Sequence, residues 1–188
     1  MARAGSTVDQ TVAKLIGLAI GSEAQARGVK AVCIGRDGRL SGPDLAEALA
    51  AGLRATGTDV IDLGRVATPM LYFAAHELGT LSGVMVTGSH NPPDYNGFKM
   101  MLAGETLSGE RIQELLKRIQ ADDFCQGEGQ YRTHSINEAY LNRITQDIKL
   151  ARPMNIVVDC GNGVAGAFAP VLYRRMDCRV RSLFCDVD

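Results

Sequence analysis

Apolar residues in the first part of the chain recur at spacings that alternate between those of helices and those of strands. Over residues 7–27 they follow one another at intervals of three and four, which places them on one face of a helix. Thr7 is a candidate cap for the start of this helix, and Gly28 is a candidate terminator. Ser41, with a proline two residues later, is typical of a second helix start. The other helices predicted in this part of the chain occupy residues 41–57 and 69–78 and begin again at residue 108.

Short apolar runs lie between these helices and are predicted to be strands. They occupy residues 31–34, 60–63, 84–86 and 98–102. Strands that alternate with helices through short connections are typical of a parallel sheet covered by helices on both faces. The sequence therefore predicts an α/β fold, a three-layer domain with a mixed, mostly parallel sheet.

The alternating pattern breaks over residues 121–133, which are polar, contain glycine and show neither helical nor strand periodicity. We interpret this stretch as a connection and expect one domain over residues 1–134 and a second from 135 to 188. The elements predicted after the connection are a helix at 136–148, a strand at 156–158, a helix at 164–176 and a strand at 180–184. One such unit buries little apolar surface, so the second domain is expected to be incomplete.

Composition places the chain among ordinary globular proteins and removes several classes of partner. Of its 188 residues, 46% are hydrophobic and 22% are charged, which excludes disordered and fibrous proteins. The net charge of -1 gives no general attraction to nucleic acid or to an anionic membrane, and we expect neither as a partner. No apolar run reaches the roughly 20 residues of a membrane span, and no signal peptide is evident, so a cytoplasmic protein is expected. Five cysteines without a C-x-x-C pair suggest neither a disulfide framework nor a zinc site.

The segment with the largest number of chemically reactive side chains close together follows the predicted strand that ends at Val86. It brings together a hydroxyl at Ser89, an imidazole at His90, an amide at Asn91 and, after a turn, an ammonium at Lys99. Loops at the carboxyl ends of parallel strands are where α/β proteins usually bind ligands. Two consecutive prolines fix the backbone of this loop, and a stiff loop suits a nucleophile that must be held in one place.

Phosphoryl transfer fits this loop better than acyl transfer does. The nucleophile elbow of serine hydrolases has glycine two residues after the serine, where this chain has Asn91. On extended backbone, neighbouring side chains point apart, so His90 is poorly placed to act as the base for Ser89 itself. Phosphoryl transfer needs an oxygen carrier, donors to the phosphoryl oxygens, positive charge and usually Mg²⁺. Ser89, the loop amides, His90 and Lys99 supply the first three.

Residues 87–99 read T-G-S-H-N-P-P-D-Y-N-G-F-K, and this sequence resembles the phosphoserine loop of the α-D-phosphohexomutases. It is most similar to the bacterial phosphomannomutase/phosphoglucomutase branch of that family. Supporting segments stand in the family's order at residues 35–43, 68–70, 103–107 and 157–166. The resemblance extends from about Val8 to the last residue.

The resemblance implies a four-domain enzyme whose loop serine is phosphorylated at rest. Ser89 would give its phosphoryl group to a mannose or glucose monophosphate, and the resulting hexose 1,6-bisphosphate would reorient and return its other phosphoryl group. His90 and Lys99 would transfer protons and stabilise charge, while Asn91 would shape the loop and, with Arg36, bind substrate. An oxygen of the phosphoryl group on Ser89 would also ligate Mg²⁺. The resemblance thus implies hexose phosphates and hexose 1,6-bisphosphate as partners.

Residues 36–39 allow two interpretations. Arg36 and Arg39 could add positive charge to the site, but Asp37 between them also permits simple pairing at the surface.

This chain departs from the family's pattern at both ends. Members of the family open with a segment similar to A-Y-D-I-R-G, which supplies a strand and a substrate-site arginine, whereas this chain opens with M-A-R-A-G. The family's magnesium loop, sugar-reading loop and last phosphate-binding loop would all lie beyond Asp188. We therefore expect a first domain without its first strand and the start of a second domain, inactive alone. Mannose, glucose and glucosamine phosphates all stay open as substrates.

Two alternatives come from different classes of protein. Residues 161–166 form a G-x-G-x-x-G motif between a strand and a helix, with Asp186 at a suitable distance, which would suit an NAD-binding oxidoreductase. The motif begins the second domain rather than the chain, however, and the mutases carry the same glycine turn there. The other alternative is a truncated remnant that folds without catalysing a reaction.

Overall fold

A mixed sheet of six strands forms the centre of residues 1–134 in the computed structural model, which describes residues 1–188. The strands are β2 (Ala31–Arg36), β3 (Asp59–Arg65), β4 (Gly83–Val86), β6 (Phe98–Leu102), β7 (Glu105–Thr106) and β8 (Tyr131–Thr133). Their order across the sheet is β7-β6-β4-β2-β3-β8. β2 is parallel to β3 and β4, and β3 is parallel to β8, whereas β6 is antiparallel to β4 and β7. The mixed, mostly parallel sheet that the sequence predicts is confirmed.

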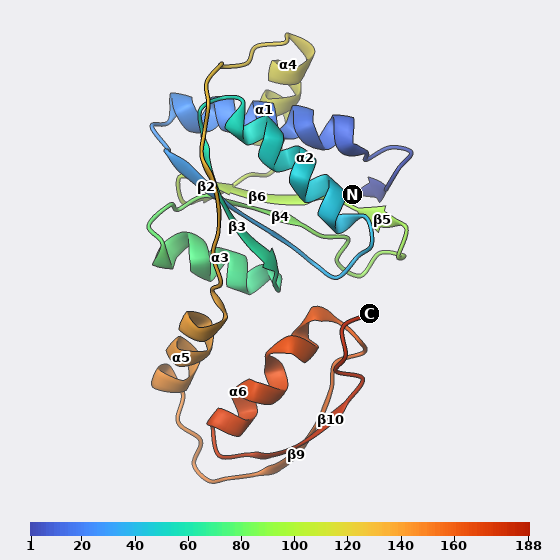
Figure 1. The fold of residues 1–188 in the computed structure, drawn as a ribbon, viewed down its shortest axis with the longest axis vertical. Coiled ribbons are helices and arrows are strands. Elements are labelled where there is room, and N and C mark those ends of the chain that lie inside the picture. The colour runs from blue at the N-terminus through green and yellow to red at the C-terminus, as the bar shows by residue number, and fades with distance from the viewer. The chain divides into compact units, whose positions relative to one another are not determined.

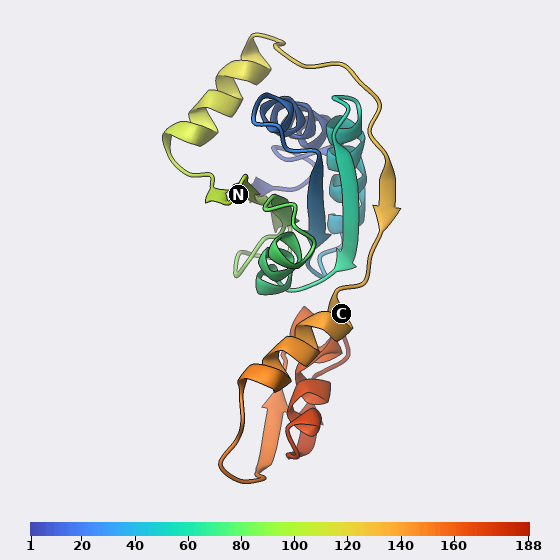
Figure 2. The ribbon, with the colours of Figure 1, turned by 90° about the vertical axis from the view of Figure 1, so that its left-hand side faces the viewer.

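Helices cover both faces of this sheet and complete a three-layer arrangement (Figure 1). The helices are α1 (Gln10–Ala26), α2 (Gly42–Arg54), α3 (Thr68–Glu77) and α4 (Glu110–Gln120). α1 and α2 lie over one face, with α4 packed beside α1, and α3 lies against the other face (Figures 1 and 2). None of the helices in the structure combines the length and the apolar character needed to cross a membrane.

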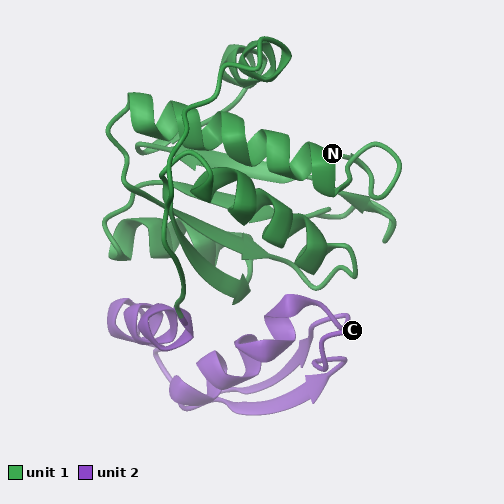
Figure 3. Ribbon diagram, turned by 45° about the horizontal axis from the view of Figure 1, so that its top comes forward, with its two compact units in different colours: residues 1–134 green, residues 135–188 purple.

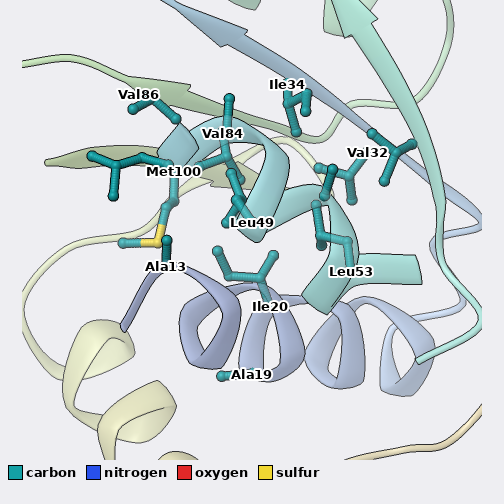
Figure 4. Close-up of a cluster of buried hydrophobic side chains, with 14 of the residues drawn as sticks. Ala13, Ala19, Ile20, Val32, Ile34, Leu49, Leu53, Val84, Val86 and Met100 are labelled. Carbon is teal, nitrogen blue, oxygen red and sulfur yellow. The ribbon is translucent and has the colours of Figure 1, made fainter. Parts of the chain in front are cut away.

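Alternation along the strands divides their side chains between the two helical layers. Val32 and Ile34 of β2 belong to the cluster under α1 and α2, where they meet Leu49 and Leu53 (Figure 4). Gly35 faces the opposite layer, where an added Cβ would collide with Val66. Because helices cover both faces of the sheet, strand side chains on either face are buried. Each Å² of apolar area that they remove from water stabilises the fold by about 25 cal/mol, and this is the main stabilising contribution to such a sheet.

Glycines let α1 and α2 approach each other closely. A Cβ at Gly17 would overlap the carbonyl oxygen of Leu49, and a Cβ at Gly52 would overlap the carbonyl oxygen of Lys14. The neighbours at this crossing are backbone atoms, which cannot rotate away as a side chain would. The two glycines therefore fix the distance between the helices over the sheet.

The first helix begins later than the sequence predicts, whereas the second begins after Ser41 as predicted but lacks the expected capping bond. α1 starts at Gln10 rather than near Thr7, and its cap is Asp9, whose carboxylate accepts a 2.8 Å hydrogen bond from the amide of Val12. α2 starts at Gly42, but the side chain of Ser41 makes no capping bond. The Ser41 hydroxyl instead accepts from the side-chain amide of Asn96, which ties the start of α2 to the loop after β4.

Four short strands escape the sequence prediction, namely β7 and β8 of the main sheet and two outside it. β8 (Tyr131–Thr133) lies in the stretch interpreted as a connection, yet it pairs with β3 at the edge of the sheet (Figure 2). β1 (Ala2–Arg3) pairs antiparallel with β5 (Tyr95–Asn96), outside the main sheet. Strands of two or three residues are too short to show alternation, and the three residues of β8 are exposed, so their sequence carries no periodic signal.

Residues 135–188 form a second compact unit (Figure 3). It contains α5 (Asn137–Asp147), β9 (Asn155–Asp159), α6 (Ala169–Arg175) and β10 (Arg179–Leu183), and the two strands are parallel. The single helix predicted over residues 164–176 is wrong in one respect, because a 3-10 helix over Val164–Ala167 precedes the separate α6. Pro170 lies in the first turn of α6, where its missing amide is tolerated. Val157 of β9 is 62% exposed, which marks a sheet face that the unit itself leaves uncovered.

Candidate active site

Two connections meet at the carboxyl edge of the sheet. β2 and β4 are parallel neighbours, so the connections that follow them emerge side by side. The first is residues 37–41, between β2 and α2, and the second is residues 87–97, which leads from β4 to β6. We call residues 87–97 the serine loop. The amide of Asp37 donates to the carbonyl of Val86 at 3.0 Å, which joins the two connections where they begin.

Ser89 lies at the exposed bend of the serine loop in the left-handed region of backbone space, with a φ of 54°. A side chain other than glycine in this conformation costs on the order of 1 kcal/mol. The bend brings the Ser89 Oγ to 3.3 Å from Nδ1 of His90. The expectation that these neighbouring side chains point apart was therefore wrong, because it assumed an extended backbone.

The amides of the serine loop mostly hold the loop itself. Gly88 donates to the Asp37 carboxylate at 3.1 Å, and Ser89 donates to the Thr87 hydroxyl at 3.0 Å. Asn91 donates to the Gly88 carbonyl, also at 3.0 Å. The prediction that the loop amides receive phosphoryl oxygens is wrong for these three, and the amide of the residue after Ser89 is the one without a partner inside the bend.

The Asn91 side chain also acts within the loop. Its amide nitrogen donates to the carbonyl of Gly88 at 2.9 Å, which closes the turn that carries Ser89. The same nitrogen lies 3.1 Å from the sulfur of Met1. These contacts agree with a role for Asn91 in shaping the loop.

Lys99 stands on β6 opposite Met85 of β4, so it shares the sheet face that α3 covers. Its side chain is half-buried and forms neither a hydrogen bond nor an ion pair, which leaves the ammonium group available to an anion.

Arg36, the last residue of β2, is not brought to Ser89 by any contact. It lines a hollow beside α2 whose other walls include Glu47, Asp62 and Tyr131. The Tyr131 hydroxyl donates to Asp62 at 2.6 Å, and partial burial followed by this carboxylate raises the pKa of Tyr131 to about 12. The structure thus gives Arg36 a different environment from Ser89 and the other residues grouped with it in the sequence prediction.

From the sequence, Arg39 could be interpreted either as added positive charge at the site or as one half of a surface pair with Asp37, and in the structure both residues contact the serine loop. Their side chains are only 18% and 13% exposed, so the interpretation of a simple surface pair is wrong for them. Arg3, on β1, also reaches the loop through an exposed ion pair of 3.3 Å with Asp94. The charge pattern R-D-G-R and the first residues of the chain were the available signals, but neither indicates which backbone the charges contact.

The side chains of this chain do not form a metal site by themselves. No group of three or more histidine, cysteine, aspartate or glutamate residues is gathered anywhere in the structure. Asp37, the carboxylate nearest to the serine loop, already accepts hydrogen bonds from Thr87 and Gly88. A magnesium ion at this loop would therefore need a ligand other than these side chains, such as a phosphoryl oxygen on Ser89.

The glycine motif after β9 is bound to the chain's last residues. The amide of Asn162 donates to the carbonyl of Phe184 at 2.7 Å, and its side chain donates to the carbonyl of Asp186. The last three residues of the motif lie in a 3-10 helix of four residues, Val164–Ala167. The long helix that would receive a dinucleotide pyrophosphate at its amino end is thus not formed.

Two cysteines also lie at the carboxyl ends of β9 and β10. The sulfur atoms of Cys160 and Cys185 are 3.5 Å apart, and both residues are half-buried. Burial and the neighbouring thiol raise the pKa of Cys160 to about 11.

Fold and site together define an α/β domain that presents a serine and a histidine on a stiff loop at the carboxyl edge of a mostly parallel sheet. The family model described as "Phosphoglucomutase/phosphomannomutase, alpha/beta/alpha domain I" matches residues 2–126. The chain belongs to the phosphoglucomutase/phosphomannomutase family, which confirms the family resemblance inferred from residues 87–99.

Relatives at about 50% identity match nearly the whole chain. A phosphoglucomutase of Neisseria meningitidis serogroup B is 54% identical over 187 residues, which are 98% of this chain and 40% of the relative. A phosphomannomutase/phosphoglucomutase of Pseudomonas aeruginosa is 53% identical over 184 residues, with the same coverage. A crystal structure of a phosphoglucomutase/phosphomannomutase family protein from Burkholderia thailandensis is 51% identical and superposes with a TM-score of 0.93 over 98% of this chain and 42% of its own. The chain thus spans about 40% of the length of the curated relatives it matches.

Proposed function

We propose that Ser89 is a phosphoryl carrier and that the protein containing this chain interconverts the 1-phosphate and the 6-phosphate of a hexose, mannose or glucose. Its substrates are then hexose phosphates, its intermediate is a hexose 1,6-bisphosphate, and it works in the cytoplasm, where such metabolites occur. Residues 1–134 carry the serine, and residues 135–188 begin a second domain. The names and the identity of the relatives support this reading of the whole protein.

The observation that carries the proposal is the position of the Ser89 hydroxyl. It is exposed at the bend of a loop in which the amides of Gly88, Ser89 and Asn91 are already bonded, and the His90 imidazole lies 3.3 Å from it. A carrier oxygen must be reachable by a sugar phosphate in two orientations, and an exposed bend allows both. A held loop keeps the oxygen in place between the two half-reactions.

The proposed reaction consists of two balanced transfers. In the first, the bond between phosphorus and the Ser89 oxygen breaks as a bond forms from phosphorus to a sugar hydroxyl oxygen. The hydroxyl proton leaves to a base, and the Ser89 oxygen takes up a proton. In the second, the Ser89 oxygen attacks the other phosphorus of the bisphosphate, and the sugar oxygen departs and takes up a proton. His90 is placed to remove the serine proton in the second transfer and to return it when the transfer reverses.

Positive charge at the site comes from Lys99 in this proposal. Its unpaired ammonium group on β6 would interact with the phosphoryl oxygens, on which negative charge is concentrated. Asn91 maintains the turn, and Arg36 remains a proposed substrate ligand. Magnesium would be bound through an oxygen of the phosphoryl group on Ser89, where it neutralises charge, and no step above depends on it.

The test uses the protein at the full length that its gene encodes. Intact and peptide mass spectrometry should find one phosphoryl group, located on Ser89. Turnover of glucose 1-phosphate and mannose 1-phosphate, started with a trace of glucose 1,6-bisphosphate, should fall at least about 1,000-fold in Ser89→Ala, because the covalent carrier is lost. Ser108→Ala is the matched control at another exposed serine and should keep full activity. More than a tenth of the activity in Ser89→Ala would overturn the proposal.

A further inference from the structure

One arginine side chain binds a large part of the serine loop's backbone. The two terminal nitrogens of Arg39 carry four N–H groups, and they donate to four carbonyl oxygens of that loop. The distances are 3.1 Å to Ser89, 2.6 Å to Asn91 and 2.9 Å to Tyr95, and the fourth acceptor is Pro92. The loop that carries the proposed nucleophile is thus joined to a side chain from the connection after β2.

The carboxylate of Asp37 contacts both Arg39 and the serine loop. It lies 3.4 Å from Nε of Arg39, the remaining donor of the guanidinium group, and accepts the amide of Arg39 at 3.1 Å. The same carboxylate accepts the Thr87 hydroxyl at 2.8 Å and the amide of Gly88 at 3.1 Å. Asp37 therefore orients the arginine and also binds the first two residues of the serine loop.

Gly88 shows how close the contact is. A Cβ at this position would overlap Nε and Cζ of Arg39. The guanidinium plane thus packs directly on the backbone of Gly88. The next residue, Ser89, is the one held in the left-handed conformation.

We propose that Arg39, oriented by Asp37, is a positioning residue that holds Ser89 and His90 in their reactive geometry. Arg39 acts through the backbone, because both of its terminal nitrogens donate to carbonyls of the serine loop and its Nε faces the Asp37 carboxylate. The inference rests on the proposed role of Ser89 as phosphoryl carrier. In this proposal the serine loop is held in place by the connection after β2 as well as by its own two prolines.

The first test compares Arg39→Lys with Arg118→Lys in the full-length protein. Lysine keeps the charge but offers three donors from one nitrogen, so it cannot reach four carbonyls in one plane. Arg118 is a matched control, since it is 21% exposed and also donates to a backbone carbonyl and a carboxylate, on α4 away from the loop. We expect kcat to fall about 100-fold in Arg39→Lys with KM changed less than threefold, and neither to change in Arg118→Lys.

Two further measurements separate positioning from a general loss of structure. The amides of Gly88, Ser89 and Asn91 should exchange hydrogen at least about tenfold faster in Arg39→Lys, while those of β2 and β4 keep the wild-type rate. In Arg39→Ala, added guanidinium ion well below denaturing concentration should restore at least a tenth of the lost kcat. Asp37→Asn should give the same loop-specific exchange with a smaller loss of kcat, because one carboxylate oxygen becomes a donor.

The outcomes distinguish this inference from the function on which it rests. If Ser89→Ala is inactive while Arg39→Lys and Asp37→Asn keep wild-type kcat, the positioning role is wrong and the carrier role stands. Faster exchange throughout the sheet with no rescue by guanidinium would reduce Arg39 to a general structural residue and also overturn the inference. If Ser89→Ala is active, the carrier role itself fails.

Discussion

The backbone strain at Ser89 makes a prediction that depends on geometry alone. The variants to compare are Ser89→Ala and Ser89→Gly, which both lack the hydroxyl and any phosphoryl group. In the left-handed conformation at a φ of 54°, alanine suffers the same crowding of Cβ as serine, whereas glycine has no Cβ. Any difference in stability between the two variants therefore reports the strain at this residue.

The expected magnitude follows from two opposing contributions. Glycine removes a strain of about 1 to 2 kcal/mol from the folded state. It also gives the unfolded chain more freedom, which costs about 0.4 to 1 kcal/mol. The backbone hydrogen bonds of residue 89 to Thr87 and Arg39 persist in both variants, because they involve main-chain atoms of that residue. Ser89→Gly should thus be more stable than Ser89→Ala by about 1 kcal/mol.

The chain has no tryptophan, so its unfolding cannot be followed by tryptophan fluorescence. Hydrogen exchange of the buried amides of β4 measures the difference in stability within residues 1–134 instead. A difference of about 1 kcal/mol makes their exchange about fivefold slower in Ser89→Gly than in Ser89→Ala. Ala103→Gly provides a control, because Ala103 has a φ of 51° and is exposed, and it should also gain about 1 kcal/mol. Equal exchange rates in the two Ser89 variants, together with a gain at Ala103, would show that Ser89 is not held in the left-handed conformation. The closeness of its Oγ to His90 would then lose its explanation.

Three further substitutions test the fold around the site. Gly17→Ala should destabilise the protein by about 2 kcal/mol in urea unfolding, because the overlap with the Leu49 carbonyl outweighs the helix propensity gained. Asp9→Ala should cost about 1 kcal/mol by the same measurement, since it removes the cap of α1. Tyr131→Phe should cost less than about 1 kcal/mol at neutral pH, because the lost bond to Asp62 is partly exposed. Because the pKa of Tyr131 is raised in the folded state, the stabilising contribution of its hydroxyl is complete below pH 10 and is lost as pH rises towards 12. The free energy of unfolding should therefore fall over that range more in the wild type than in Tyr131→Phe.

Each of these predictions has a neighbouring position that should behave differently. At Gly42 an added Cβ would only reach ordinary contact, 3.5 Å from the side chain of Arg36, so Gly42→Ala should not destabilise. Thr7→Ala should have little effect if Asp9 is the cap, and a cost equal to that of Asp9→Ala would contradict the helix start seen here. An unchanged or raised stability in Gly17→Ala would mean that α1 and α2 can separate. Parallel pH profiles of wild type and Tyr131→Phe would show that the Tyr131 hydroxyl titrates normally.

Much of the fold could be predicted from the sequence because its elements are long enough to show a period. Residues 31–34 and 83–86 are continuous apolar runs, as expected for strands covered on both faces, and the helix at 42–54 carries one apolar stripe. β8 could not be found in this way, because its position depends on pairing with β3 and not on side-chain burial.

The site could be predicted only as far as residue type and order carry it. Ser89, His90, Asn91 and Lys99 were grouped because they follow one strand or lie on the next, and the structure keeps them around one loop or its adjoining strand. Arg36 was grouped with them as a source of positive charge, yet it lines a hollow beside α2. Which of two arginines three residues apart turns towards a loop is decided by tertiary contacts, and R-D-G-R alone does not contain that information.

The two prolines and Arg39 explain the stiffness of the serine loop together. Pro92 and Pro93 fix φ but have no amide hydrogen, so this part of the loop cannot satisfy its neighbours' carbonyls as a strand would. Arg39 supplies donors from outside the loop, and one of its four acceptors is the carbonyl of Pro92 itself. This solution requires the connection after β2 to lie beside the connection after β4, which the parallel pairing of these strands provides. The position of Ser89 is thus determined by strand order as much as by the residues next to it.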